Sequence, residues 1–216
     1  MNCKKYFMTM PNRINHVNTQ LYMPNSIIIN AYNDINMSIS PLYVKDFKLK
    51  KKELCALTYI KTLKTFIETN DKICIIFEDD IIIKNELIND IDKIENICIN
   101  HNLDLIYLYH LELNYTKIIN IDNINFIDNI SDGNQAIMWS RNGAIKFLNN
   151  LPIILAKDNW LKNLIDNGIF TSLSTYDNYV DNLGCKGIED YQSIMGSNIY
   201  NIKPLNTLGK YKKINY

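Results

Sequence analysis

The stretch CIIFEDDIIIK, residues 74–84, places three consecutive carboxylates inside an apolar run. The residues before the carboxylates, together with Ile73, have the length and composition of a buried β-strand. Glu78, Asp79 and Asp80 therefore stand where that strand ends. Ligands of open α/β sheets bind outside the carboxyl ends of the strands, so this position predicts a binding site.

The segments around this strand alternate between short apolar runs and helical periodicity. Further strands are predicted over 6–10, 26–30, 104–110 and 135–140, and helices over 53–68, about 87–98 and 141–150. Ser140 is expected to cap the last of these helices, and a shorter helix holding Trp160 should follow Pro152. Residues 169–216 predict loops and short strands. This alternation indicates an α/β protein built around a mostly parallel sheet.

Length and charge limit the classes of protein to which the chain can belong. A chain of 216 residues without repeats or a Pro/Gly/Ser linker is expected to form a single domain over residues 1–216. Basic and acidic side chains both total 23, so the net charge is zero. The chain therefore lacks the overall basic field that favours nucleic acid as a partner.

The five cysteines are odd in number and form no CxxC pair, which favours reduced thiols. No apolar stretch approaches the ~20 residues of a membrane span. The start MNCKKYF has too little apolar length for a secretory signal. We therefore expect a cytoplasmic protein that does not span a membrane.

The carboxylates of residues 78–80 require compensation, because adjacent like charges repel and lose hydration on burial. Mg²⁺ or Mn²⁺ prefers oxygen ligands and would supply that compensation while also holding a diphosphate. The alternative is a polar strand end at which Asp80 or Asn85 caps the next helix. Taken alone, the three residues leave both interpretations open.

Other common sites lack their motifs. No GxGxxG follows a strand and no GxxxxGK[ST] is present, so dinucleotide and P-loop phosphate binding lose support. A metal-dependent nuclease would carry a further acid close by, but the chain continues as Ile-Ile-Ile-Lys over 81–84. His16, His101 and His110 have no zinc-ligand spacing with one another or with cysteine.

With these motifs in view, the chain resembles the family 25 glycosyltransferases, the lipooligosaccharide and procollagen galactosyltransferase family. The resemblance is carried by FMTMPNRINHV (7–17), CALTYIKTLKTFIETNDKICIIFEDDIII (55–83), LDLIYLYH (103–110), GNQAIMWSRNGAIKFLNNLP (133–152) and KDNWL (157–161), and it covers most of residues 4–165. Residues 166–216 are not aligned. Tyr59 stands where the family usually has His, Thr58 where it has Ser and Leu54 where Gly is common.

The resemblance implies a GT-A fold, a Rossmann-like nucleotide-sugar-binding sheet, and inverting transfer that depends on Mn²⁺ or Mg²⁺. It implies donor-binding roles for Asn12, Arg13, Glu78 and Asp79. Asp80 and Glu78 are the expected metal ligands. The donor is expected to be a UDP-hexose carrying galactose or glucose.

On the acceptor side, inverting transfer needs a base that takes the proton of the acceptor hydroxyl. Asp158 is the candidate catalytic residue, with a helix N-cap as its alternative role. The candidate acceptor-binding residues are Asn134, Gln135 and Trp160. The acceptor would be a hydroxyl of a glycan or of a protein, such as collagen-like hydroxylysine. A further metal ligand would come from Asp181, Glu189 or Asp190.

Two other functions remain open from the sequence. The first is a catalytically silent domain that binds a glycan or nucleotide on a transferase scaffold, because Tyr59 replaces the family His. The second is a metal-dependent phosphatase or nuclease, which would act without a sugar donor.

Overall fold

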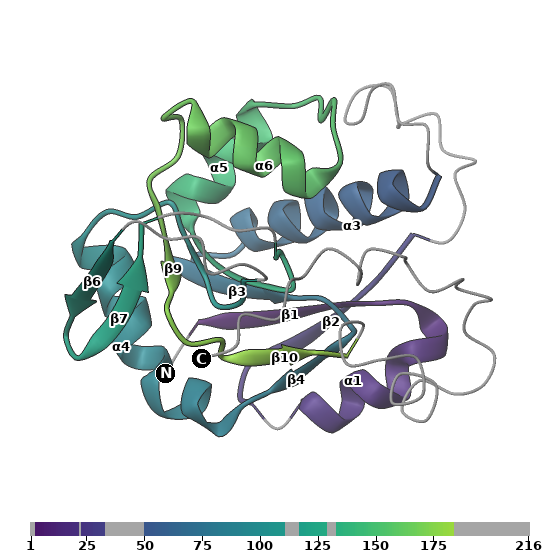
Figure 1. Ribbon diagram of the computed structural model, residues 1–216. Coiled ribbons are helices and arrows are strands. Elements are labelled where there is room, and N and C mark those ends of the chain that lie inside the picture. Colours follow the sequence, from purple (N-terminus) through teal and green to yellow (C-terminus); the bar gives the residue numbers. More distant parts are fainter. Residues whose placement is uncertain (1–2, 22, 33–49, 111–116, 129–132, 184–216) are drawn as a thin grey trace, which may run out of the picture.

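The structure is a computed structural model that describes residues 3–21, 23–32, 50–110, 117–128 and 133–183 (Figure 1). Its strands are β1 (Lys4–Thr9), β2 (Ser26–Asn30), β3 (Ile73–Phe77), β4 (Ile81–Ile83), β5 (Leu105–Tyr107), β6 (Ile118–Ile121), β7 (Ile124–Ile127), β8 (Ala136–Ser140), β9 (Ser172–Thr175) and β10 (Val180–Asn182). Its helices are η1 (Pro11–Arg13), α1 (Ile14–Gln20), α3 (Lys50–Ile67), α4 (Asn85–Asn100), α5 (Arg141–Asn149) and α6 (Lys157–Asp166). The α/β class predicted from the sequence is confirmed.

Eight strands form one sheet in the order β2-β1-β3-β8-β5-β9-β7-β6, and β4 pairs with β10 in a separate two-stranded sheet. The pairs β1 with β2, β1 with β3, and β5 with β9 are parallel. The other four pairings of the large sheet are antiparallel. The sheet is therefore mixed, and the expectation of a mostly parallel sheet is wrong.

The departure from parallel order begins after β5. A parallel return requires a crossover, usually a helix, that carries the chain back to the edge where the first strand began. The described residues between β5 and β8 instead form the β6–β7 hairpin, whose turn holds Asp122 and Asn123 at positive φ of 51° and 64°. Strand β8 consequently enters the sheet from the edge at which β3 and β5 end.

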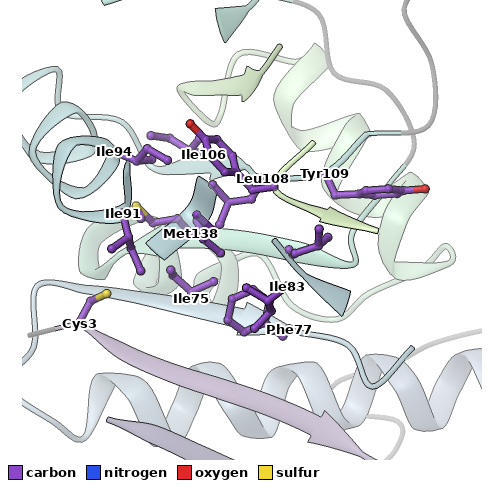
Figure 2. Close-up of a cluster of buried hydrophobic side chains, with 14 of the residues drawn as sticks. Cys3, Ile75, Phe77, Ile83, Ile91, Ile94, Ile106, Leu108, Tyr109 and Met138 are labelled. Atoms are coloured by element: carbon purple, nitrogen blue, oxygen red, sulfur yellow. The ribbon is translucent and has the colours of Figure 1, made fainter. Parts of the chain in front are cut away.

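Helices cover both faces of the sheet (Figure 1). On one face α3, α5 and α6 pack over Tyr59, Leu63, Trp139 and other buried residues. On the other face, Phe77, Ile75 and neighbouring strand residues pack with α4 (Figure 2). All five residues of β3 are buried, because each face of the strand meets one of these two cores. This explains the uninterrupted apolar run in the sequence.

Of the helix N-caps considered from the sequence for α5 and α4, one is confirmed and one is wrong. Ser140 caps α5 as predicted, with its hydroxyl accepting a hydrogen bond from the Gly143 N–H at 3.1 Å. The proposal that Asp80 or Asn85 caps α4 is wrong, because Lys84 holds the N-cap position and makes no side-chain cap. None of the described helices has both the length and the apolar character needed to cross a membrane.

Candidate functional site

The three parallel strands β2, β1 and β3 are adjacent in the sheet and end at the same edge, called here the carboxyl edge. A cleft of about 230 Å³ lies there. It is lined by Met10 and Arg13 after β1, Ala31 and Tyr32 after β2, Cys55 and Thr58 of α3, and the carboxylate triplet Glu78, Asp79 and Asp80 after β3. All three residues of the triplet thus line a cavity at the end of β3.

Asp79 connects the end of β3 to the loop after β1. Its Oδ2 accepts a hydrogen bond from the Met10 N–H at 2.9 Å, and its Oδ1 lies 2.5 Å from Nη1 of Arg13. The side chains of Arg13 and Asp79 are only 13% and 10% exposed, so water screens this ion pair weakly. The structure therefore brings together two predicted donor-binding residues and pairs them with each other.

Glu78 is paired in the same way, with a residue that the sequence analysis did not single out. Nζ of Lys157, the first residue of α6, donates a hydrogen bond to Glu78 Oε1 at 2.8 Å. The Lys157 side chain is 3% exposed, whereas that of Glu78 is 23% exposed and lines the cleft. Burial raises the pKa of Glu78, and the Lys157 ammonium opposes that shift.

An aromatic ring completes the surroundings of Lys157. Its ammonium lies 4.2 Å from the centroid of the Tyr59 ring, a distance suited to a cation–π contact. The Tyr59 hydroxyl accepts a hydrogen bond from Nε1 of Trp139 at 2.7 Å, which fixes the ring. Burial alone would lower the pKa of Lys157, but Glu78 and other negative neighbours raise it well above its ordinary value. Lys157 is therefore a buried ammonium whose charged form is stabilised by its neighbours.

Asp80 differs from its two neighbours. Its Oδ1 is buried and has no hydrogen-bond partner among the described residues. Burial raises the pKa of Asp80 to about 7, and the charges of Glu78 and Asp79 act in the same direction. Arg13 opposes the shift. An isolated buried carboxylate oxygen is costly, so this atom fits a site that an external cation completes.

Protein ligands other than carboxylates would have to complete such a site. Within the described part of the chain, no group of three or more His, Cys, Asp or Glu side chains is arranged to hold a metal. Oδ1 of Asn134 and Oε1 of Gln135 are also buried oxygens that lack a partner among the described residues. Because β8 runs antiparallel, these residues lie at the carboxyl edge, where the Glu78 N–H donates to the Gln135 carbonyl at 2.9 Å.

The remaining predicted residues lie around this centre. Asp158 is not the N-cap of α6, a position that Ala156 holds; it lies in the first turn, with its side chain 53% exposed and 3.7 Å from Lys157 Nζ. Trp160 packs partly buried against the core beneath α3. Asn12 is exposed in η1. Asp181 pairs with Lys84 at 3.4 Å. Glu189 and Asp190 lie outside the described residues.

Sequence reasoning missed Lys157, although one local signal was present. A lysine in the first turn of a helix is unfavourable next to the positive end of the helix dipole, so KDNW at the start of α6 suggests a compensating partner. That partner is Glu78, which lies 79 positions earlier in the chain.

No protein-family model matches the chain, and no curated protein matches it. Among solved structures the chain is similar to that titled "Crystal Structure of A197 from STIV". The match has a TM-score of 0.43 and 14% sequence identity, and it covers 79% of this chain and 81% of the other. A similarity at this level supports no statement about fold or function.

Proposed function

We propose that this protein is a metal-dependent glycosyltransferase that transfers a hexose, galactose or glucose, from a UDP-sugar to an acceptor hydroxyl. The observation that carries the proposal is the buried Oδ1 of Asp80, which has no hydrogen-bond partner in the described part of the chain and lies beside a cleft at the carboxyl edge of three parallel strands. A nucleotide diphosphate with a bound metal ion supplies the cation that Asp80 lacks.

The arrangement of the strands is compatible with a Rossmann-like, GT-A-type nucleotide-sugar site. The cleft lies outside the carboxyl ends of β2, β1 and β3, where ligands of α/β sheets bind. Tyr32 offers an aromatic ring in the cleft wall, and Arg13 offers a guanidinium close to the triplet. These groups suit a base and a phosphate respectively.

The metal, Mn²⁺ or Mg²⁺, would be held by Asp80 with the amide oxygens of Asn134 and Gln135 as further candidate ligands. Carboxylate and amide oxygens are the ligand types that these ions prefer. When bound, the metal would offset the negative charge that develops on the leaving diphosphate. Glu78, which we expected to ligate the metal directly, is already paired with Lys157.

For the acceptor, we propose Asp158 as the base that takes the hydroxyl proton. Its exposed carboxylate can be reached from solvent, and Lys157 connects it to the cleft-lining Glu78. A glycan hydroxyl or a protein hydroxyl such as hydroxylysine is the proposed acceptor. Trp160, two positions after Asp158, is the proposed contact for the apolar face of a sugar ring.

Calorimetry of UDP binding tests the proposal. We expect UDP to bind in the presence of Mn²⁺ and to lose most of its affinity when a chelator is in excess, because Asp80, which has no counter-charge among the described residues, repels a diphosphate without a cation. Asp80→Asn should weaken metal-dependent binding in the same way. Equal UDP affinity with Mn²⁺ and with chelator would refute the metal-dependent site.

A second candidate function is a catalytically silent glycan- or nucleotide-binding domain. It is favoured by the position of Asp158, which is 53% exposed and does not line the cleft. The two functions differ in turnover: the transferase hydrolyses or transfers from a UDP-hexose when Mn²⁺ is present, whereas the binding domain retains UDP affinity and releases no sugar.

A further inference from the structure

Among the residues that the structure describes, the carboxylate triplet is only partly compensated by positive side chains. Arg13 pairs with Asp79 at 2.5 Å, and Lys157 pairs with Glu78 at 2.8 Å. No ion pair to Asp80 is found among the described residues, and its Oδ1 is buried without a hydrogen-bond partner. Among the described residues, two internal cations thus face three carboxyl groups, and Asp80 is the one without a counter-charge.

Several contacts fix Lys157 in its ion pair with Glu78. Lys157 is 3% exposed, its ammonium lies over the Tyr59 ring at 4.2 Å, and the ring is fixed by Trp139. The position of Lys157 at the first residue of α6 fixes where its side chain starts. Lys157 therefore behaves as a built-in counter-charge whose location is set by α3, α6 and β8 together.

We infer that Lys157 is a positioning residue of the metal site: by compensating Glu78 from inside the protein, it leaves Asp80 as the carboxylate that receives the external divalent cation. This inference rests on the proposed function, because it assumes that a metal binds at Asp80. Under this inference, Glu78 places a negative charge near the metal but does not bind it. The sequence analysis had predicted Glu78 as a metal ligand, so its role is revised.

A purely structural ion pair makes a different prediction. If Lys157 only stabilised the fold, its replacement would lower the melting temperature and would leave Mn²⁺ affinity unchanged or weaker. If Lys157 compensates Glu78, its replacement exposes the metal site to a second uncompensated carboxylate. The affinity for Mn²⁺ then increases, because opposite charges at short range attract more strongly.

The experiment measures binding of Mn²⁺ alone to the nucleotide-free, full-length protein by calorimetry and by the electron paramagnetic resonance of free Mn²⁺. We expect Lys157→Met to bind Mn²⁺ about tenfold more tightly than wild type, and Glu78→Gln to bind it about tenfold more weakly. Lys157→Arg keeps the charge and should remain close to wild type. In Glu78→Gln/Lys157→Met the two charge changes cancel, so the affinity should return to the wild-type value.

If Lys157→Met does not fold, Glu78→Gln and the double variant still test the inference: the affinity for Mn²⁺ should fall in Glu78→Gln and recover in the double variant, which leaves no unpaired charge at this position. A double variant that is folded by circular dichroism and has lost Mn²⁺ binding would show that Glu78 is a direct ligand and would overturn the inference. A folded Lys157→Met with unchanged or weaker Mn²⁺ affinity would also overturn it.

Failure of the proposed function has a separate signature. If Asp80→Asn binds Mn²⁺ as well as wild type does, the metal-dependent function and this inference are both refuted. If Asp80→Asn abolishes binding and the Lys157 and Glu78 variants behave otherwise than expected, only the inference is refuted.

Discussion

The ionisation of Asp80 should make the stability of the metal-free protein depend on pH. Burial, reinforced by Glu78 and Asp79, raises the pKa of Asp80 from 3.8 to about 7. Between those values the folded protein holds a proton that the unfolded chain has released, so the free energy of unfolding falls as pH rises. We expect the melting temperature, measured with chelator present, to fall more steeply from about pH 4.5 to 8 in wild type than in Asp80→Asn.

The Asn variant is the matched control because its side chain keeps the shape of Asp80 and cannot ionise. Glu78 is present in both proteins, so the difference between the two curves reports the ionisation of Asp80 together with its interaction with Glu78. Parallel curves for the two proteins would contradict the raised pKa of Asp80. Addition of Mn²⁺ at the upper end of this pH range should restore stability to wild type only, by binding the ionised carboxylate.

Asp158 can be tested separately from donor binding. Asp158→Asn keeps the shape and removes the base, so single-turnover transfer at saturating donor should fall by about 10² to 10⁴. UDP affinity should stay unchanged, because Asp158 does not line the cleft. Asp80→Asn should instead weaken the binding of UDP, because it removes a proposed metal ligand.

The alternative role of Asp158 as N-cap no longer competes with this test, since Ala156 is the N-cap. Wild-type transfer by Asp158→Asn would therefore remove Asp158 as the base. The carboxylates to examine next would be Asp181, Glu189 and Asp190.

The sequence predicts the position of the triplet but not its pairing. The apolar run 73–77 stops at Glu78, so the place of the carboxylates at a strand end follows from local pattern alone. The partners do not, because Arg13 and Lys157 lie 66 and 79 positions from Asp79 and Glu78. The hydrophobic periodicity of a segment does not indicate which residues far away in the sequence it will contact.

Among the helices, α5 depends on a single close approach to the sheet. A Cβ at Gly143 would lie 2.1 Å from the backbone oxygen of Asp104, just before β5. Because neither backbone can move freely, we expect Gly143→Ala to destabilise the protein by about 1–3 kcal/mol or to displace α5. Chemical denaturation measures this loss.

Ile145→Ala is a suitable control for Gly143→Ala because it lies in the same helix and its side chain is 38% exposed. It should change stability far less than the loss expected for Gly143→Ala. Equal stability of Gly143→Ala and wild type would show that α5 can shift away from Asp104 without loss of packing.

The direction of the strands was the least predictable property of the elements. Strand β8 is fully apolar from 136 to 139, and such a run has the same pattern whether its neighbours are parallel or antiparallel. The β6–β7 hairpin had a local signal, since Asp122-Asn123 between two Ile-containing runs is a typical turn pair. Recognising that turn would have indicated the reversal of the chain before β8.

At the scale of the whole molecule, the sequence resemblance described above and the net charge of zero lead to a prediction about the nucleotide-sugar donor. We expect UDP-galactose or UDP-glucose with Mn²⁺ to raise the melting temperature in a panel of nucleotide sugars, because ligands that bind only the folded state stabilise it. Stabilisation by a sialic-acid donor, with no response to any UDP-hexose, would contradict this prediction.

Composition and periodicity were sufficient for the α/β class, because strands covered on both faces and helices with one apolar face leave strong patterns. Strand β2 was predicted with its observed bounds, and α3 to within a few residues. The order of the strands was not predictable, since it depends on which apolar surfaces meet after the chain has folded.

The burial of Lys157 has a consequence for the response of the site to ionic strength. Dissolved salt screens pairs such as Lys162–Asp166, whose side chains are 45% and 56% exposed, but it has little access to an ammonium that is 3% exposed. Salt should therefore weaken the Lys157–Glu78 pair less than it weakens Lys162–Asp166, and it should reach the pair only through Glu78, which is 23% exposed. For the same reason, sodium ions from solution should not replace the ammonium lost in Lys157→Met, since a mobile ion cannot occupy a space that the fold has closed to water.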